Sequence, residues 1–194
     1  MKDQLHLLIF FIVFRNHMFV IVTGFMGAGK STFLSLAEKF LKNYKGGPQL
    51  EWDFVDLDNY LEKSFQKSIP QLFKQGEDKF REIEFEKLQE LIILYSESNK
   101  NLMLSLGGGG LHQLSFDFLH KKRAYLIWIE TPIEICLERI ENDSNRPLAC
   151  QNKNLITDLY QKRITWYQKA NKKISGQIEF GQEIFKNILL NPQS

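Results

Sequence analysis

The chain contains 194 residues, of which 43% are hydrophobic and 25% charged, and its 25 basic and 23 acidic side chains leave a formal net charge of +2. This length and composition predict one globular domain and exclude collagen-like, disordered and disulfide-scaffold proteins. The nearly balanced charge also excludes a dedicated nucleic-acid binder, because no broad positive surface would attract a phosphate backbone.

Residues 1–17 precede the first predicted strand and contain an apolar run of ten residues, from Leu5 to Phe14. This run is too short to span a membrane, which takes about 20 residues, and its flanks lack the features of a signal peptide. We therefore predict an N-terminal extension. Two alternatives stay open: the extension is dispensable or lies upstream of the true start, or it packs on the body as an added strand or helix.

Strand and helix patterns alternate along the rest of the chain. Apolar runs predict strands at residues 19–23, 102–106 and 124–129. A further strand is predicted to end in Asp56-Leu57-Asp58, and a short one near residues 172–175. Helical spacing covers residues 30–43, 59–96 and 178–190, and Thr131-Pro132-Ile133-Glu134 predicts a helix start with Thr131 as its N-cap. This alternation predicts a parallel α/β sheet in one domain, residues 18–194.

The cysteines of the chain show no metal-binding pattern. Cys136 and Cys150 fit neither the spacing of a zinc site nor a disulfide framework. Free thiols are typical of a reducing compartment, so the protein is expected in the cytoplasm.

A glycine-rich turn follows the first predicted strand and reads Gly24-Phe25-Met26-Gly27-Ala28-Gly29-Lys30-Ser31. It matches G-x-x-x-x-G-K-[ST] between a buried strand and a helix, the context that distinguishes a phosphate-binding loop from an incidental glycine turn. Glycines allow backbone N–H groups to surround phosphate oxygens at the positive end of the helix dipole. Lys30 can then reach the β- and γ-phosphates, and Ser31 can ligate Mg²⁺. The motif predicts binding of ATP or GTP.

No carboxylate follows the third predicted strand, where one is normally expected to support a Mg²⁺ ion. Asp56 is the candidate replacement, because ligands collect at the carboxyl ends of strands in open α/β sheets. Asp58 could reach the same site if it also falls at the strand's end. Taken by itself, a D-x-D pattern is more typical of a solvent-exposed turn than of a metal site.

Two later features point to an anion site. Arg81 and Glu84 lie three residues apart on a predicted helix, either as a surface ion pair or as a clamp in which Glu84 orients Arg81 towards an anion. Four glycines, residues 107–110, follow a buried strand and suit a backbone that a ligand approaches closely, with a flexible turn as the alternative.

The use of arginine supports the same site. Only six of the 25 basic residues are arginine, at positions 15, 81, 123, 139, 146 and 163. Because arginine has a planar fork of donors, a lysine-rich chain is expected to keep it where anions bind. Arg146 falls in a polar loop, and Arg163 shares a helix face with Tyr167.

These motifs occur in a familiar order. GFMGAGKST, DLD, FREIE, GGG, an Arg seven residues before RPL, and RITWYQKA have the order and spacing of the shikimate kinases, which the chain resembles from about residue 18 to residue 190. The resemblance implies a three-layer α/β/α fold with a five-stranded parallel sheet, as in nucleoside monophosphate kinases. It also implies a cytoplasmic monomer that uses ATP and Mg²⁺ on the small molecule shikimate, without a nucleic-acid or membrane partner.

For the nucleotide, the resemblance implies that Gly27, Ala28, Gly29, Lys30, Ser31 and Thr32 wrap the phosphates. It implies that Ser31 ligates Mg²⁺ and that Asp56 holds the ion through water. Arg146, on a lid at about residues 142–153, would reach the ATP phosphates, and Arg139 would lie beside the adenine and phosphates.

For the acceptor, the resemblance implies that Asp58 contacts the shikimate hydroxyl that receives the phosphate. Shikimate would be bound by Arg81, Gly107, Gly108, Gly109 and Arg163, with the arginines on its carboxylate. Lys30, Asp58 and Arg146 are the expected catalytic residues. RPLA replaces the commoner RPLL, a fourth glycine follows the triplet, and residues 1–17 have no counterpart, but none of these departures removes a binding group.

The predicted reaction transfers the γ-phosphoryl group of ATP to the 3-hydroxyl of shikimate, mainly by alignment and charge neutralisation. Two rivals stay open: a gluconate-type kinase on the same scaffold, and a catalytically silent nucleotide-binding module. The first should not combine the D-x-D, FRxxE and GGG motifs, and the second should have lost Lys30, Asp58 or Arg163.

Overall fold

The computed structural model describes residues 18–45, 51–98, 100–141, 153–176 and 180–189. Within these residues the centre of the molecule is a five-stranded sheet of order β2-β3-β1-β4-β5, in which every neighbouring pair is parallel. The strands are β1 (Phe19–Thr23), β2 (Trp52–Asp56), β3 (Asn101–Ser105), β4 (Tyr125–Glu130) and β5 (Lys172–Ser175). The predicted parallel α/β sheet is confirmed.

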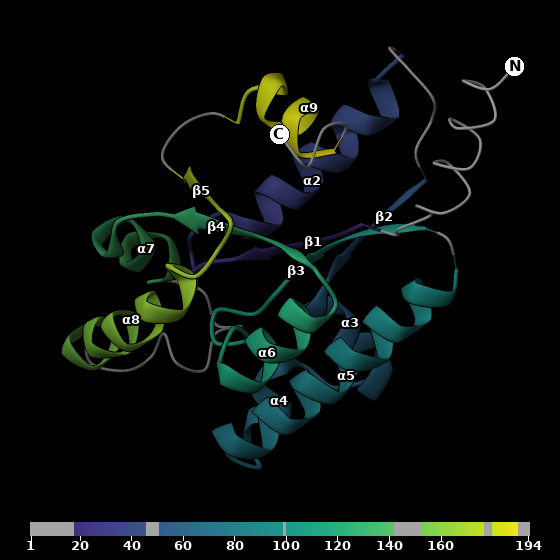
Figure 1. Ribbon diagram of the computed structural model, residues 1–194. Helices are drawn as coiled ribbons and strands as arrows, with labels where there is room; N and C mark the ends of the chain where they lie inside the picture. The colour runs from purple at the N-terminus through teal and green to yellow at the C-terminus, as the bar shows by residue number, and fades with distance from the viewer. Residues whose placement is uncertain (1–17, 46–50, 99, 142–152, 177–179, 190–194) are drawn as a thin grey trace, which may run out of the picture.

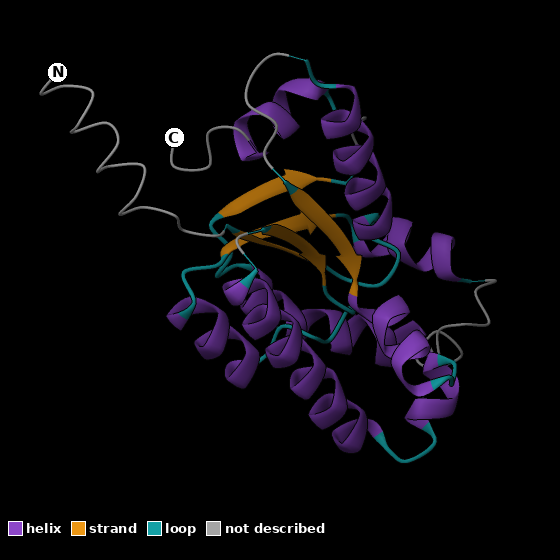
Figure 2. Ribbon diagram, turned by 90° about the vertical axis from the view of Figure 1, so that its right-hand side faces the viewer, coloured by secondary structure: helices purple, strands orange, loops and turns teal. Residues whose placement is uncertain are grey.

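Helices cover both faces of this sheet (Figures 1 and 2). On one side lie α2 (Lys30–Asn43) and α9 (Gln182–Leu189), which contact each other, and on the other lie α5 (Glu77–Glu97) and α6 (Gln113–Lys121). The remaining helices are α3 (Leu57–Phe65), α4 (Ile69–Phe73), α7 (Ile133–Ile140) and α8 (Lys153–Tyr167). Among the described residues, no helix has the length and apolar character that crossing a bilayer requires.

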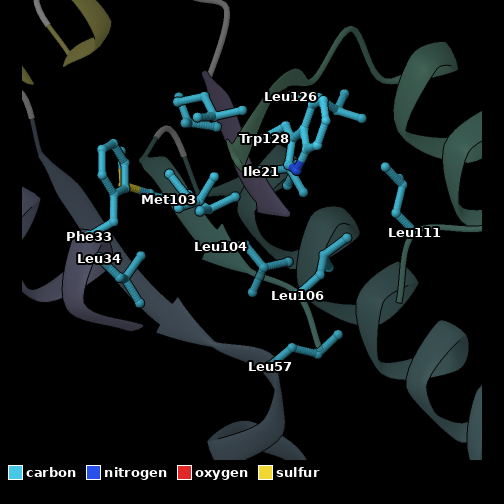
Figure 3. Close-up of a cluster of buried hydrophobic side chains, with 14 of the residues drawn as sticks. Ile21, Phe33, Leu34, Leu57, Met103, Leu104, Leu106, Leu111, Leu126 and Trp128 are labelled. Carbon is cyan, nitrogen blue, oxygen red and sulfur yellow. The ribbon is translucent and has the colours of Figure 1, made fainter. Parts of the chain in front are cut away.

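The core lies between the central strands and the helical layers. All five residues of β1 are buried, because this strand pairs with β3 on one side and β4 on the other. Figure 3 shows Ile21 of β1 among Met103, Leu104, Leu126 and Trp128 from the neighbouring strands. Burying each such side chain stabilises the fold by roughly 1.5–3 kcal/mol, which holds the strand ends, and the loops after them, in place.

The carboxyl ends of three strands meet at one edge of the sheet. Asp56 of β2 is in register with Ser105 of β3, and Ser105 is in register with Val22 of β1. The segments that follow these strands are the phosphate-binding loop, the D-x-D segment and the four glycines, so the topology gathers all three motifs at this edge.

The region predicted as helical at residues 59–96 is confirmed as mainly helical, and it consists of α3, α4 and α5. Gln66 adopts a left-handed φ of 51° and ends α3, while Ser68 and Gln71 form a capping box that starts α4. Gly76, with a φ of 101°, precedes α5. The pattern of apolar residues did not reveal these breaks, because each helix keeps its apolar stripe on the same core.

Three further details differ from the sequence prediction. Strand β2 ends at Asp56, whose carboxylate accepts hydrogen bonds from the N–H groups of Asp58 and Asn59, so Asp58 lies in the first turn of α3. Helix α6 was not predicted. Thr131 is not an N-cap, since α7 follows Pro132 and the Thr131 hydroxyl is hydrogen-bonded elsewhere.

Candidate active site

The glycine-rich turn between β1 and α2 leads into the N-terminus of α2, which no side chain caps. Gly29 precedes α2 with no side-chain cap, and the first turn of α2 contains no acidic residue. Gly27 has a φ of 78°, and a Cβ on it would lie 2.7 Å from the carbonyl oxygen of Cys136, so neither its backbone nor its surroundings accept a side chain. The first N–H groups of α2, a helix of 14 residues, therefore point towards this loop. They form the positive end of the helix dipole.

Side chains from outside the loop hold its carbonyl groups. The Thr131 hydroxyl donates to the Ala28 carbonyl at 2.9 Å, and Arg139 Nη1 donates to the Gly27 carbonyl at 3.0 Å. Lys30 is buried, and its Nζ donates to the Phe25 carbonyl at 3.1 Å. Because these carbonyls are engaged, the loop keeps a curvature that suits a phosphate group.

Asp56 and Ser31 lie together beside this loop. The Ser31 hydroxyl donates to Asp56 Oδ2 at 2.9 Å, while Asp56 Oδ1 caps α3. A hydroxyl and a carboxylate are hard oxygen ligands of the kind that Mg²⁺ prefers. The pair fits the Mg²⁺ site predicted from the sequence, although the described residues contain no cluster of three or more His, Cys, Asp or Glu that would form a metal cage.

The four glycines after β3 make room for charged side chains. A Cβ on Gly107 would lie 2.7 Å from Glu84 Oε1 and 2.8 Å from Asp58 Oδ1. A Cβ on Gly109 would collide with Arg81 Nη2 and lie 2.7 Å from Arg163 Nη2. The run is thus a surface against which two carboxylates and two guanidinium groups pack, because it lacks side chains.

This surface adjoins the phosphate-binding loop. A Cβ on Gly108 would lie 3.0 Å from the backbone nitrogen of Met26, which belongs to that loop. The hydroxyl of Tyr167 donates to the Gly108 carbonyl, and burial raises the pKa of Tyr167, so this donor stays protonated. A molecule lying on the glycines would therefore be next to the terminal phosphate of a nucleotide in the loop.

Glu84 is buried and Arg81 is partly buried, which disfavours the exposed surface pair, one of the two alternatives left by the sequence. Arg81 Nη1 donates to Glu84 Oε2 at 2.6 Å, and Glu84 is only 2% exposed. Glu84 Oε1 is buried as well and has no hydrogen-bond partner among the described residues. Burial would lower the pKa of Arg81, but the carboxylates of Glu84 and Glu77 outweigh it and raise that pKa above its ordinary value.

Arg163 reaches the same place from α8. Its guanidinium is also buried, lies 5.8 Å from the ring centre of Phe25, and is 3.4 Å from Glu77 Oε1. Burial lowers the pKa of Arg163, and the positive charge of Arg81 lowers it further, although an arginine remains charged at neutral pH. A buried and a partly buried guanidinium beside a glycine backbone can attract an anion, and their fork geometry suits a carboxylate.

Comparison with known proteins identifies the family to which the chain belongs. A family model described as shikimate kinase matches residues 26–191. The chain is 35% identical to the shikimate kinase of Aquifex aeolicus over 174 residues, covering 89% of this chain and 94% of that protein. It is 34% identical to the shikimate kinase of Persephonella marina, covering 88% and 96% of the two chains. The chain belongs to the shikimate kinase family.

Solved structures of shikimate kinases have the same fold. A shikimate kinase from Acinetobacter baumannii, in complex with shikimate, superposes with a TM-score of 0.73 at 29% identity and covers 94% of this chain and 98% of that one. The Aquifex aeolicus enzyme gives a TM-score of 0.66 at 31% identity, covering 91% and 96%. The predictions of the family, of its α/β/α fold, and of an ATP-dependent kinase with the function of a shikimate kinase are confirmed.

Most residues singled out from the sequence as shikimate kinase site residues gather at this one edge of the sheet. Arg139 braces the phosphate-binding loop through Gly27, and its Nη2 lies 3.5 Å from the Gly176 carbonyl. Arg146 and the proposed lid at about 142–153 lie outside the described residues, apart from Lys153 at the start of α8. The sequence reasoning missed two residues, Thr131 and Glu77. The spacing of Glu77, four residues before Arg81, was the available signal for the second.

Proposed function

We propose that this enzyme transfers the γ-phosphoryl group of ATP to the 3-hydroxyl of shikimate with the residues of this edge. The observation that carries the proposal is the glycine run, where Asp58, Glu84, Arg81 and Arg163 converge beside the phosphate-binding loop. Shikimate has a carboxylate at one end and ring hydroxyls at the other, which matches a surface with two cations at one glycine and two carboxylates at another.

The nucleotide half of the proposal rests on the start of α2. The N–H groups of residues 27–32 would surround the phosphates, and Lys30 would turn from the Phe25 carbonyl to the β- and γ-phosphates. Arg139 would hold the loop and contact the nucleotide beside it. Arg146 remains part of the proposal as a further cation for the transferring group.

A Mg²⁺ ion would be held by the Ser31 hydroxyl and, through water, by Asp56. When bound, the ion supplies positive charge that neutralises the phosphate oxygens. Asp56 also caps α3, so the same carboxylate that would support the ion fixes the helix that carries Asp58. The nucleotide half and the acceptor half of the site are thereby joined through one side chain.

The acceptor half would be oriented by carboxylates on one side and arginines on the other. Asp58 Oδ1 would accept a hydrogen bond from the attacking hydroxyl and could take its proton. Glu84 Oε1, buried without a partner among the described residues, offers a second acceptor for a ring hydroxyl. Arg81 and Arg163 would bind the carboxylate of shikimate together with the backbone at Gly108.

The direct test measures ADP release by the purified protein with ATP and Mg²⁺, in the presence of shikimate, of gluconate, or without an acceptor. We expect release only with shikimate. Comparable release with gluconate would favour the gluconate-type rival, and no acceptor-dependent release at all would favour a silent nucleotide-binding module.

Gly109→Ala tests whether the arginines must lie against the glycine backbone. The new Cβ would displace the guanidinium groups of Arg81 and Arg163, so KM for shikimate should rise about tenfold or more while KM for ATP stays unchanged. The thermal midpoint should change little, because the displaced atoms are the ends of flexible side chains. Gly181→Ala is the matched control, since a Cβ there meets nothing within 4 Å. Equal KM values for the two variants would contradict the proposed placement of shikimate.

We also propose that one chain, acting as a cytoplasmic monomer without nucleic-acid or membrane partners, provides the whole site from residues 18–194. The contacts invoked above join segments of one chain, and the buried thiol of Cys136 donates to the Thr131 carbonyl of the same chain at 3.7 Å. A chain that starts at Met18 should keep kcat and KM within about twofold, because its first strand and its hydrogen bond from Met18 N to Asn101 Oδ1 are retained. A large loss of activity or of thermal stability would instead assign residues 1–17 to the folded body.

A further inference from the structure

Glu77 lies between the two arginines of the proposed carboxylate site. Its Oε1 accepts a hydrogen bond from Arg81 Nη2 at 3.0 Å and lies 3.4 Å from Arg163 Nη2. A single carboxylate oxygen thus bridges the two guanidinium groups.

The nitrogens that Glu77 engages are the ones that face the glycine backbone. Arg81 Nη2 and Arg163 Nη2 are both among the atoms nearest to a Cβ placed on Gly109. Arg81 Nη1, in contrast, is held by Glu84. The nitrogens that would meet a carboxylate lying at Gly109 therefore already donate to a carboxylate of the protein.

The charge of this cluster leads to the same conclusion. Arg81, Arg163, Glu84 and Glu77 together carry no net charge, and Asp58 beside Gly107 adds a negative one. A bound ligand carboxylate would make the cluster more negative still unless one of the protein's carboxylates moved away. A buried excess charge is costly, which favours an exchange of one carboxylate for another over the addition of a third.

Glu77 is the carboxylate that can leave. Its side chain is 44% exposed, whereas that of Glu84 is 2% exposed. Glu77 lines a cavity of about 500 Å³ together with Arg81, Gly109, Arg163 and Trp166, so it has space into which it can turn. It is also the first residue of α5, where the helix dipole continues to favour its negative charge after release.

We propose that Glu77 occupies the place of the substrate's carboxylate in the empty enzyme and is displaced when shikimate binds. This inference rests on the proposed function, because it takes Arg81 and Arg163 as the carboxylate site. While the site is empty, Glu77 neutralises two adjacent cations and keeps them at Gly109. When the substrate arrives, the same contacts compete with it, so Glu77 sets the affinity for the carboxylate.

Glu77→Gln tests the competition. The amide can still accept a hydrogen bond from the arginines, but it has no charge, so it competes less well with a ligand carboxylate. KM for shikimate should fall about two- to tenfold, in keeping with the strength of partly exposed ion pairs, while KM for ATP stays unchanged. The fluorescence of Trp166, which lines the same cavity, should report a matching fall in Kd when shikimate is titrated without ATP.

Two controls separate competition from a general change of charge. Glu82→Gln removes a charge from the same cavity, but Glu82 pairs with Lys79 and not with either arginine, so KM should stay unchanged. A shikimate analogue with a neutral carboxamide in place of the carboxylate should show the same Kd for wild type and Glu77→Gln, because it does not displace Glu77.

The outcomes are distinguishable. An unchanged or increased KM and Kd for shikimate in Glu77→Gln would overturn the inference and make Glu77 a residue that only positions the arginines. An equal gain in Glu82→Gln would overturn it too, as a nonspecific charge effect. If the unmodified protein releases no ADP with shikimate, the proposed function itself fails, while the titrations without ATP still report on the displacement.

Discussion

Asp58→Asn is expected to lower kcat by about 10²–10⁴-fold, the usual contribution of a positioned proton acceptor. Asp58 Oδ1 packs against Gly107, in the first turn of a helix capped by Asp56, so its carboxylate is aimed at the glycine surface. Asparagine keeps the shape of the side chain but loses its charge and its ability to take a proton. A coupled ADP-release assay with saturating shikimate measures the loss.

ATP binding should survive this substitution, because the phosphate-binding loop is held by Thr131, Arg139 and Lys30 and not by Asp58. Asp53→Asn is the matched control. Asp53 lies on β2, accepts a hydrogen bond from the Tyr95 hydroxyl and pairs with Lys100, so its loss should affect stability more than turnover. Near-normal shikimate-dependent ADP release by Asp58→Asn would refute its assigned role.

Arg163→Ala is expected to lower kcat/KM for shikimate by roughly two to three orders of magnitude, the cost of removing one partner of a buried charged hydrogen bond. The guanidinium lies beside Phe25, Gly109 and Glu77 and is only 9% exposed, so its removal leaves Glu77 without one of its two cationic partners. Arg163→Lys should recover only part of the loss, because an ammonium group keeps the charge without the planar fork. Steady-state kinetics with varied shikimate measures both effects.

The neighbouring Lys162→Ala is the control for Arg163→Ala, since Lys162 is exposed on the same helix and lines the same cavity. Its KM for shikimate should stay close to that of the unmodified enzyme, and the Kd for ATP should be equal in all three variants. If Arg163→Ala retained normal turnover, the carboxylate of the substrate would have to bind elsewhere.

The nucleotide half of the site could be predicted from the sequence because it is local. The glycines, Lys30 and Ser31 lie within one short segment, and the strand before it and the helix after it are visible as apolar patterns. The ends of β1, β2 and β3 were also placed within a residue or two, and parallel strands bring their carboxyl ends to one edge. The sequence therefore placed Asp56 and the glycine run at this edge, and Asp58 only on the condition that it also ended the strand.

Other features depend on contacts between distant segments. The Thr131 hydroxyl was predicted to cap α7, but it bonds to Ala28, 103 residues earlier, because β4 ends beside the phosphate-binding loop. The division of residues 59–96 into three helices depends on single residues such as Gln66. The spacing of apolar residues does not reveal the left-handed backbone conformation of Gln66.

The arginines illustrate both kinds of information. The small number of arginines in a lysine-rich chain indicated that some of them bind an anion, because arginine offers a planar fork of donors. Arg81 and Arg163 lie beside Gly109, Arg139 contacts the phosphate-binding loop, and Arg123 lies in the turn before β4, with a φ of 54°.

Whether Arg81 and Glu84 formed a surface pair or a buried clamp could not be read from a spacing of three residues, because burial depends on what packs over the helix. The tertiary structure shows that Glu84 is buried against the glycines that follow β3. The same packing brought Arg163 from α8 to the oxygen of Glu77, 86 residues away in the sequence.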